Sequence, residues 1–165
     1  MKYSGEKELI INILKNKNVL IGGVCGSGKS LIIKYLSRLY NDKILIDCYS
    51  GYLKIDELNH EKPIFLDGIE IYDNIELKKI IGLKNKLICS SHINSYNKGS
   101  FTVSRQIRDS YFFDYVLKIE KLKDNFIYLS EIKNRCINNN LMNYKIDLNG
   151  SILNCLRKEK MKKVV

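Results

Sequence analysis

A glycine-rich motif at residues 23–30 restricts the fold of this chain more than any other segment. It reads Gly-Val-Cys-Gly-Ser-Gly-Lys-Ser and matches the phosphate-binding pattern G-x-x-x-x-G-K-S at every defined position. The apolar run at 19–21 predicts a short buried strand before it, and residues 31–39 have a helical pattern after it. Backbone N–H groups of such a loop bind phosphate together with the helix N-terminus. The motif therefore predicts a strand–loop–helix unit that holds a nucleotide; the alternative is a glycine-rich turn without a ligand.

The last residues of the motif indicate the chemistry of the loop. Lys29 is expected to contact the β- and γ-phosphates, and the Ser30 hydroxyl is expected to coordinate Mg²⁺. The predicted cofactors are therefore a nucleoside triphosphate, taken as ATP, and Mg²⁺. The residues predicted to contact the nucleotide are Gly23, Val24, Cys25, Gly26, Ser27, Gly28, Lys29, Ser30 and Leu31.

Length and composition favour a single domain. We place it at residues 1–155, with an N-terminal helix inside 1–16 and a basic tail at 156–165. No apolar run approaches the roughly 20 residues of a membrane span, and the first residues lack the apolar core of a signal peptide. The five cysteines are scattered without a C-x-x-C pair, which is typical of reduced thiols. We therefore expect a cytoplasmic protein with no membrane partner.

The charge of the chain is strongly basic. Its net charge of +10 comes from 28 basic and 18 acidic residues. A basic surface is typical of proteins that bind nucleic acid. The alternative is compositional, because the chain is rich in Lys, Asn, Ile and Tyr, which an AT-rich coding sequence favours. Charge alone therefore leaves nucleic-acid binding open.

Hydrophobic patterns along the chain alternate between strands and helices. This alternation predicts a parallel sheet covered by helices, and hairpins in the last third add antiparallel strands at one edge. The fold class is therefore α/β, a three-layer sandwich with a mostly parallel central sheet. A polar loop at 93–104 and a short helix carrying Arg105 and Arg108 are predicted after the fourth strand. The other predicted elements are helices from a Ser4 cap to about Lys15 and at 73–83, with Ile75, Leu77, Ile80 and Ile81 facing inward, and strands at 43–47, 64–67, 86–92, 115–119, 126–132 and 144–147.

Three further residues are candidates for the chemistry of the site. Asp67 ends the apolar strand 64–67, the Walker B pattern, and its carboxylate is expected to hold the metal through water. Glu70 is a candidate general base; the alternative is a surface glutamate at the start of a helix, where acidic residues are common. His92 follows Ser90 and Ser91 at a strand tip and is placed to sense the γ-phosphate; the alternative is a strand that simply enters solvent.

The order of these parts resembles the RecA/DnaB/KaiC-like branch of P-loop ATPases over about residues 17–155. The resemblance rests on the glycine motif, the strand 64–67, the strand end at 90–92 and a C-terminal stretch that includes Asp114-Tyr115-Val116 and Lys133-Asn134-Arg135. It implies a homo-oligomeric ring or filament with ATP between subunits, in which Lys133 and Arg135 reach the neighbouring site and stabilise charge on the γ-phosphate. It also implies contact between residues 94–108 and single-stranded DNA.

The chain departs from that family at the catalytic carboxylate. The family usually has a glutamate just beyond the second strand, where this chain has Asp47 followed by Cys48. Asp47 could act as the base with a shorter reach, Glu70 could replace it, or hydrolysis could be slow. We therefore expect an oligomeric ATPase that acts with DNA. The alternatives are an AAA+-like loader or a nucleotide-dependent switch with little hydrolysis; a small-molecule kinase fits less well.

Overall fold

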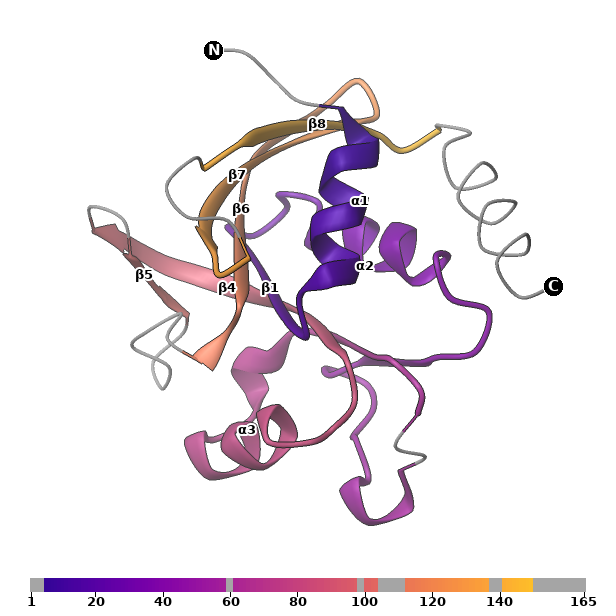
Figure 1. Cartoon of the computed structure of the whole chain (residues 1–165). Helices are drawn as coiled ribbons and strands as arrows, with labels where there is room; N and C mark the ends of the chain where they lie inside the picture. The colour runs from indigo at the N-terminus through magenta and orange to yellow at the C-terminus, as the bar shows by residue number, and fades with distance from the viewer. Residues whose placement is uncertain (1–4, 59–60, 98–99, 104–111, 137–140, 150–165) are drawn as a thin grey trace, which may run out of the picture.

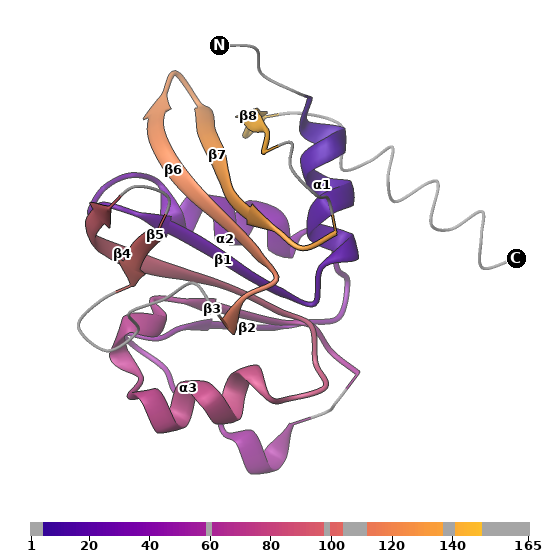
Figure 2. The same cartoon turned by 60° about the vertical axis from the view of Figure 1, so that its left-hand side comes forward.

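A mixed β-sheet with helices on both faces forms the body of the protein (Figures 1 and 2). The computed structural model describes residues 5–58, 61–97, 100–103, 112–136 and 141–149. Its helices are α1 (Glu6–Lys15), α2 (Lys29–Ser37) and α3 (Asn74–Ile81), with the short 3-10 helices η1 (Ile55–Glu57) and η2 (Ile69–Ile71). Its strands are β1 (Asn18–Gly23), β2 (Ile44–Asp47), β3 (Ile64–Asp67), β4 (Leu87–Asn97), β5 (Ser100–Val103), β6 (Tyr115–Lys123), β7 (Phe126–Asn134) and β8 (Asn143–Asp147).

The strands follow the order β2-β3-β4-β1-β6-β7-β8, and β5 pairs with β4 outside this path. The pairs from β2 to β6 are parallel, whereas β6, β7 and β8 form an antiparallel meander. The prediction of an α/β fold with a mostly parallel sheet and C-terminal antiparallel strands is therefore confirmed. Strand β4 lies between β1 and β3, so the carboxyl ends of these three strands meet at one edge of the sheet.

Each face of the sheet has its own hydrophobic core. Val19 and Ile21 of β1 pack with residues of α1 and α2, whereas Leu20 packs on the other face with residues of α3. All three side chains are fully buried. A strand that is apolar on both faces is typical of the centre of a parallel sheet. The layers are therefore helix, sheet and helix, with β1 near the middle.

Several predicted elements differ from the structure. Residues 93–97 continue β4 and pair antiparallel with β5, so the predicted loop at 93–104 is wrong over these strands. Ile75 does not face inward, because it is 67% exposed on α3. Gly5 is the N-cap of α1, and the predicted cap Ser4 lies outside the described residues, as do Arg105 and Arg108. None of the helices in the described ranges has the length and apolar character to cross a membrane.

A buried carboxylate holds the meander together. Glu131 on β7 is 4% exposed and accepts hydrogen bonds from the Tyr115 hydroxyl at 2.7 Å, from the Met142 N–H at 3.0 Å and from the Tyr144 hydroxyl. The Asn134 amide adds a fourth donor at 3.5 Å. Burial, together with the hydrogen bond to Glu131, raises the pKa of both tyrosine hydroxyls, so they remain protonated donors. The carboxylate therefore joins β6, β7 and the segment before β8.

Replacing this acceptor is expected to destabilise the fold. Glu131→Gln exchanges one acceptor oxygen for an N–H₂ group that faces donors, and the free energy of unfolding should fall by about 2 kcal/mol. Urea denaturation with an unchanged m-value would measure the loss. Glu8→Gln on the exposed surface of α1 is the control and should stay within about 0.5 kcal/mol of the wild type. Equal stability of the two variants would contradict this role of Glu131.

Candidate functional site

The segment between β1 and α2, residues 23–28, forms a tight loop that we call the glycine loop. Gly26 has φ 73° and Gly28 has φ 97°, a left-handed conformation that side chains with a Cβ rarely adopt. Gly28 is the N-cap of α2, whose first residue is Lys29. The chain therefore turns directly from the end of a buried strand into a helix N-terminus, where backbone N–H groups favour an anion.

Two side chains show what the inside of the glycine loop offers. The Lys29 ammonium donates a hydrogen bond of 2.8 Å to the Val24 carbonyl, so it lies across the loop rather than away from it. Ser27 is buried, and its hydroxyl has no hydrogen-bond partner. Buried polar atoms without partners are uncommon in native proteins and call for an explanation such as a missing ion. A phosphate oxygen bound in the loop would give this hydroxyl the partner it lacks.

Side chains of strands β6 and β7 pack against the glycine loop. A Cβ atom at Gly28 would lie 3.3 Å from Cδ2 of Leu122 and 3.6 Å from Cδ1 of Ile127. A Cβ atom at Gly23 would lie 2.3 Å from the Ser27 hydroxyl oxygen and 3.3 Å from Cβ of Ile119. The loop therefore has no room for side chains at these two glycines. Sequence analysis did not find Ile119, Leu122 or Ile127, because their spacing predicts only a strand.

The carboxyl ends of the parallel strands place four residues in one row. Asp47 of β2 pairs with Asp67 of β3, Asp67 with Ser90 of β4, and Ser90 with Ile21 of β1. The Ser90 hydroxyl donates a 2.5 Å hydrogen bond to the Asp67 carboxylate and accepts one of 3.0 Å from the Gly68 N–H. Because neighbouring strands lie about 4.8 Å apart, Asp67 is roughly 10 Å from β1 and Asp47 roughly 14 Å. The structure thus brings Asp67 nearer the glycine loop than Asp47.

Glu70 approaches the glycine loop more closely through its hydrogen bonds. It accepts a hydrogen bond of 3.3 Å from the His92 backbone N–H, and His92 is the strand partner of Gly23, where the glycine loop begins. The Tyr49 hydroxyl also donates to the Glu70 carboxylate. This hydrogen bond, together with burial, raises the pKa of Tyr49 and keeps its donor proton in place. Tyr49 in the turn after β2 and His92 within β4 therefore fix Glu70 one strand away from the glycine loop.

The backbone at Gly68 leaves room for the Tyr49 ring, whose hydroxyl donates to Glu70. Gly68 follows Asp67 with φ 95°, and a Cβ atom there would lie 2.6 Å from the Tyr49 ring. Only glycine lets the ring of Tyr49 lie against the chain between Asp67 and Glu70. Sequence analysis did not identify Tyr49. Its position two residues after Asp47 could have indicated that it lies at the same edge of the sheet.

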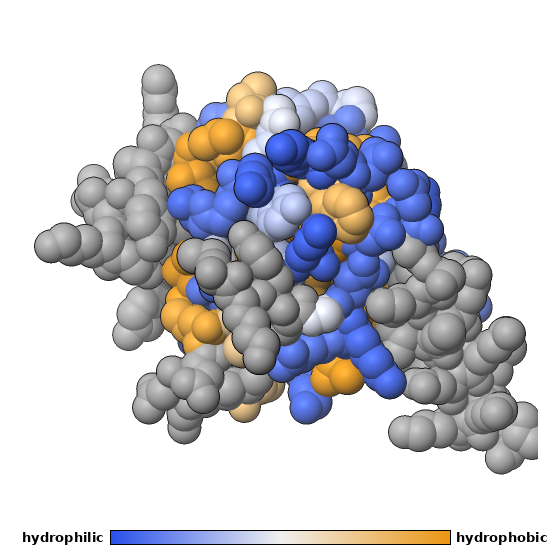
Figure 3. Space-filling model, turned by 90° about the horizontal axis from the view of Figure 1, so that it is seen from above, coloured by the Kyte–Doolittle hydropathy of each residue, from blue (hydrophilic) through white to orange (hydrophobic). Residues whose placement is uncertain are grey.

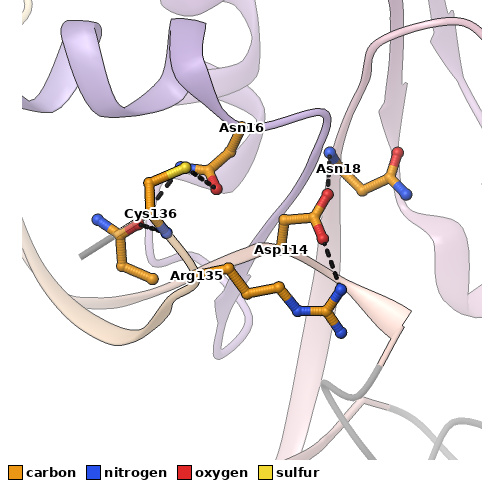
Figure 4. A network of polar contacts seen from close by, with 6 residues as sticks. Asn16, Asn18, Asp114, Arg135 and Cys136 are labelled. Atoms are coloured by element: carbon orange, nitrogen blue, oxygen red, sulfur yellow. Dashed lines mark hydrogen bonds and ion pairs between the residues drawn. The ribbon is translucent and has the colours of Figure 1, made fainter. Parts of the chain in front are cut away.

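Lys133 and Arg135 lie at the opposite end of the sheet from the glycine loop, where Figure 4 shows Arg135 beside Asp114 and Asn18. Arg135 forms an ion pair of 3.0 Å with Asp114, whose carboxylate also accepts a hydrogen bond of 3.2 Å from the Asn18 N–H. Asn18 begins β1, about 17 Å along the strand from Gly23 at its end. Burial and the nearby Arg135 lower the pKa of Lys133. Within one copy of the chain, these two cations are therefore remote from the glycine loop.

The donor set suits magnesium better than a metal held by protein ligands alone. Within the described ranges, no group of three or more His, Cys, Asp or Glu side chains gathers as a metal site. Mg²⁺ typically takes one or two protein oxygens, phosphate oxygens and water. Ser30, exposed at the start of α2, and Asp67, half-buried at the end of β3, have side-chain oxygens that could hold such an ion, directly or through water.

In comparisons with known proteins, no family model and no curated protein matches the chain.

The thiols provide a test of the exposed glycine loop. Cys25 in the loop is an exposed free thiol, whereas Cys48 and Cys89 are buried. Burial raises the pKa of Cys48 to about 11 and also raises that of Cys89. At about pH 8, N-ethylmaleimide should therefore modify Cys25 at least roughly a hundredfold faster than Cys48, because the thiolate reacts. A time course by peptide mass spectrometry would measure both rates, with exposed Cys136 as the control; a protected Cys25 in nucleotide-free protein would contradict the loop geometry.

Proposed function

We propose that the chain is an ATP hydrolase that binds Mg-ATP in the glycine loop. The observation that carries the proposal is the loop itself, in which an unpartnered Ser27 hydroxyl and the inward-lying Lys29 ammonium face a helix N-terminus. These groups have the charge and geometry to hold two adjacent phosphates. The remaining polar groups at this edge, Asp67 and Glu70, then have roles that follow from their distances to the loop.

In this proposal each side chain has one task. Lys29 balances the negative charge that develops on the terminal phosphate, and Ser30 with Asp67 would hold Mg²⁺, which neutralises phosphate charge when bound. Ser90 orients the Asp67 carboxylate through its hydrogen bond. Glu70 orients the attacking water and accepts its proton. We prefer Glu70 to Asp47 because the backbone N–H of His92 ties Glu70 to the strand next to the loop.

We retain the RecA-like branch and a homo-oligomer as parts of the proposal. Lys133 and Arg135 would act only in the site of a neighbouring copy, since they lie far from the glycine loop of their own chain. Arg135 would have to leave its ion pair with Asp114 to do so. An AAA+-like loader is less well supported, because the residues described at 115–123, 126–134 and 143–147 form strands where a helical lid would follow.

Removing the Lys29 ammonium tests nucleotide hydrolysis directly. Lys29→Ala should lower ATP turnover at least about a hundredfold, because the charge on the transferred phosphoryl group loses its partner. Phosphate release under saturating Mg-ATP would measure the change. Lys34→Ala, on the exposed side of the same helix, is the matched control and should retain turnover. Full activity of the Lys29 variant would refute the site.

Binding can be tested in the unaltered protein as well. Mg-ATP at about ten times its Kd should slow the alkylation of Cys25 about tenfold, since only nucleotide-free loops expose it. Cys136, at the opposite end of the sheet, should react at the same rate with and without nucleotide. Unchanged alkylation of Cys25 at saturating Mg-ATP would count against binding in the loop.

The choice between the two carboxylates gives a separate prediction. Glu70→Gln should lower kcat by about 10²–10⁴-fold while Mg-ATP still protects Cys25, because the variant keeps the loop but loses the proton acceptor. Asp47→Asn should leave kcat nearly unchanged. Tyr49→Phe should have an intermediate effect, since it removes one of the hydrogen bonds that position Glu70. The reverse pattern would assign the base to Asp47.

A further inference from the structure

The outer face of the β6–β8 meander has a regular pattern of lysines and aromatic rings. Lys121 on β6 pairs with Tyr128 on β7, which in turn pairs with Lys145 on β8. Two residues further along these strands, on the same face, Lys123 pairs with Phe126. The three lysines are exposed and the two rings are half-buried. We call these five residues the lysine–aromatic face.

The lysines of this face lie over the rings. The Lys121 ammonium is 4.6 Å from the centre of the Tyr128 ring, and the Lys145 ammonium is 4.1 Å from Phe126 and 5.8 Å from Tyr128. Such cation–π contacts leave the full positive charge on the surface. Two carboxylates lie close by: Glu120 forms an ion pair of 3.4 Å with Lys118, and Asp147, the strand partner of Phe126, accepts a hydrogen bond of 2.9 Å from the Asn149 N–H. The face therefore offers ammonium groups and flat rings side by side.

The inner face of the same strands is occupied. Ile127 and Leu129 of β7 and Ile146 of β8 pack in the core with residues of α1 and α2. Helix α3 packs on the other side of the sheet with residues of β3 and β4. The rings of Phe126 and Tyr128 thus point away from the core that α1 and α2 cover. Figure 3 shows that the end of the molecule with the β6–β7 turn is predominantly hydrophilic, with apolar patches between.

Single-stranded nucleic acid fits this pattern of groups. Its phosphates attract ammonium groups, and its unpaired bases stack on aromatic rings. Phe126 and Tyr128 lie two residues apart on one strand face, about 7 Å from ring to ring along the strand, so neighbouring bases could stack on successive rings. A duplex keeps its bases paired and would gain only the contacts to phosphate. The arrangement therefore favours an unpaired strand.

We propose that the lysine–aromatic face binds single-stranded nucleic acid, whose phosphates draw Lys121 and Lys145 away from the rings and also contact Lys123, so that bases stack on Phe126 and Tyr128. This surface differs from residues 94–108, where the family resemblance would place such contacts. It does not require the glycine loop to bind ATP.

Fluorescence anisotropy, measured with the full chain in the absence of ATP, tests the proposal. The probes are labelled oligo-dT and oligo-U of about 16 nucleotides and a DNA duplex of the same length. The paired change Phe126→Leu and Tyr128→Leu keeps apolar volume and removes both rings, and should weaken binding of the single strands by about tenfold or more. Tyr128→Phe keeps the ring and should bind like the wild type. The comparison of oligo-dT with oligo-U identifies which nucleic acid is preferred.

The charge contribution is measured by the salt dependence between about 50 and 200 mM. Lys121→Gln with Lys145→Gln should reduce the slope of log K against log salt by about 0.7 for each lost phosphate contact. Lys78→Gln with Lys79→Gln on exposed α3 removes the same charge and should change neither slope nor affinity. Circular dichroism melting establishes that each variant is folded.

Four results would overturn the proposal. These are a lack of binding of either single strand, wild-type affinity in the variant without rings, tighter binding of the duplex than of the single strands, and competition by polyglutamate that is as strong as competition by oligo-dT. Because no ATP is present in this assay, its outcome does not depend on whether the chain hydrolyses ATP.

Discussion

The in-register pairing of β3, β4 and β1 is the constraint on which the site depends. It aligns Asp67, Ser90 and Ile21 in one row, and it pairs His92 with Gly23 two residues further along. Side chains alternate between the faces of a strand, so a slip of one residue would turn each polar tip to the other face. The fully buried Ser90 stabilises the pairing, because its hydroxyl bonds to both the side chain of Asp67 and the backbone that follows.

Elements that depend on local sequence could be predicted, and those that depend on distant partners could not. Strand β3 has the predicted bounds Ile64–Asp67, because a short apolar run between Pro63 and Gly68 predicts a strand with both ends defined. Strand β4 extends past the predicted 86–92, since pairing with β5 overrides the polar composition of its second half. The position of β4 between β1 and β3 has no local signal at all, because parallel neighbours are joined through long connections.

The same distinction applies to the candidate site. The turn of the glycine loop from β1 into α2 could be predicted, because glycines stand at the two positions of positive φ, Gly26 and Gly28. The hydrogen bonds of Glu70 could not, since Tyr49 comes from the turn after β2 and His92 from within β4. The ion pair between Arg135 and Asp114 has no local signal either, because the two residues are 21 positions apart in the chain. It joins the residue after β7 to the residue before β6.

One irregularity in β6 connects the glycine loop with the outer face of the meander. The register of β6 and β7 shifts between Ile119 and Lys121, so one extra residue is accommodated at Glu120. Without this bulge, the alternation that buries Ile119 would also turn Lys121 toward the core. With it, Leu122 packs against Gly28 on the inner face while Lys121 lies over Tyr128 on the outer face. Leu122, which packs against the glycine loop, and Lys121, which would meet a nucleic-acid phosphate, are therefore neighbours in the chain, and neither can move far without displacing the other.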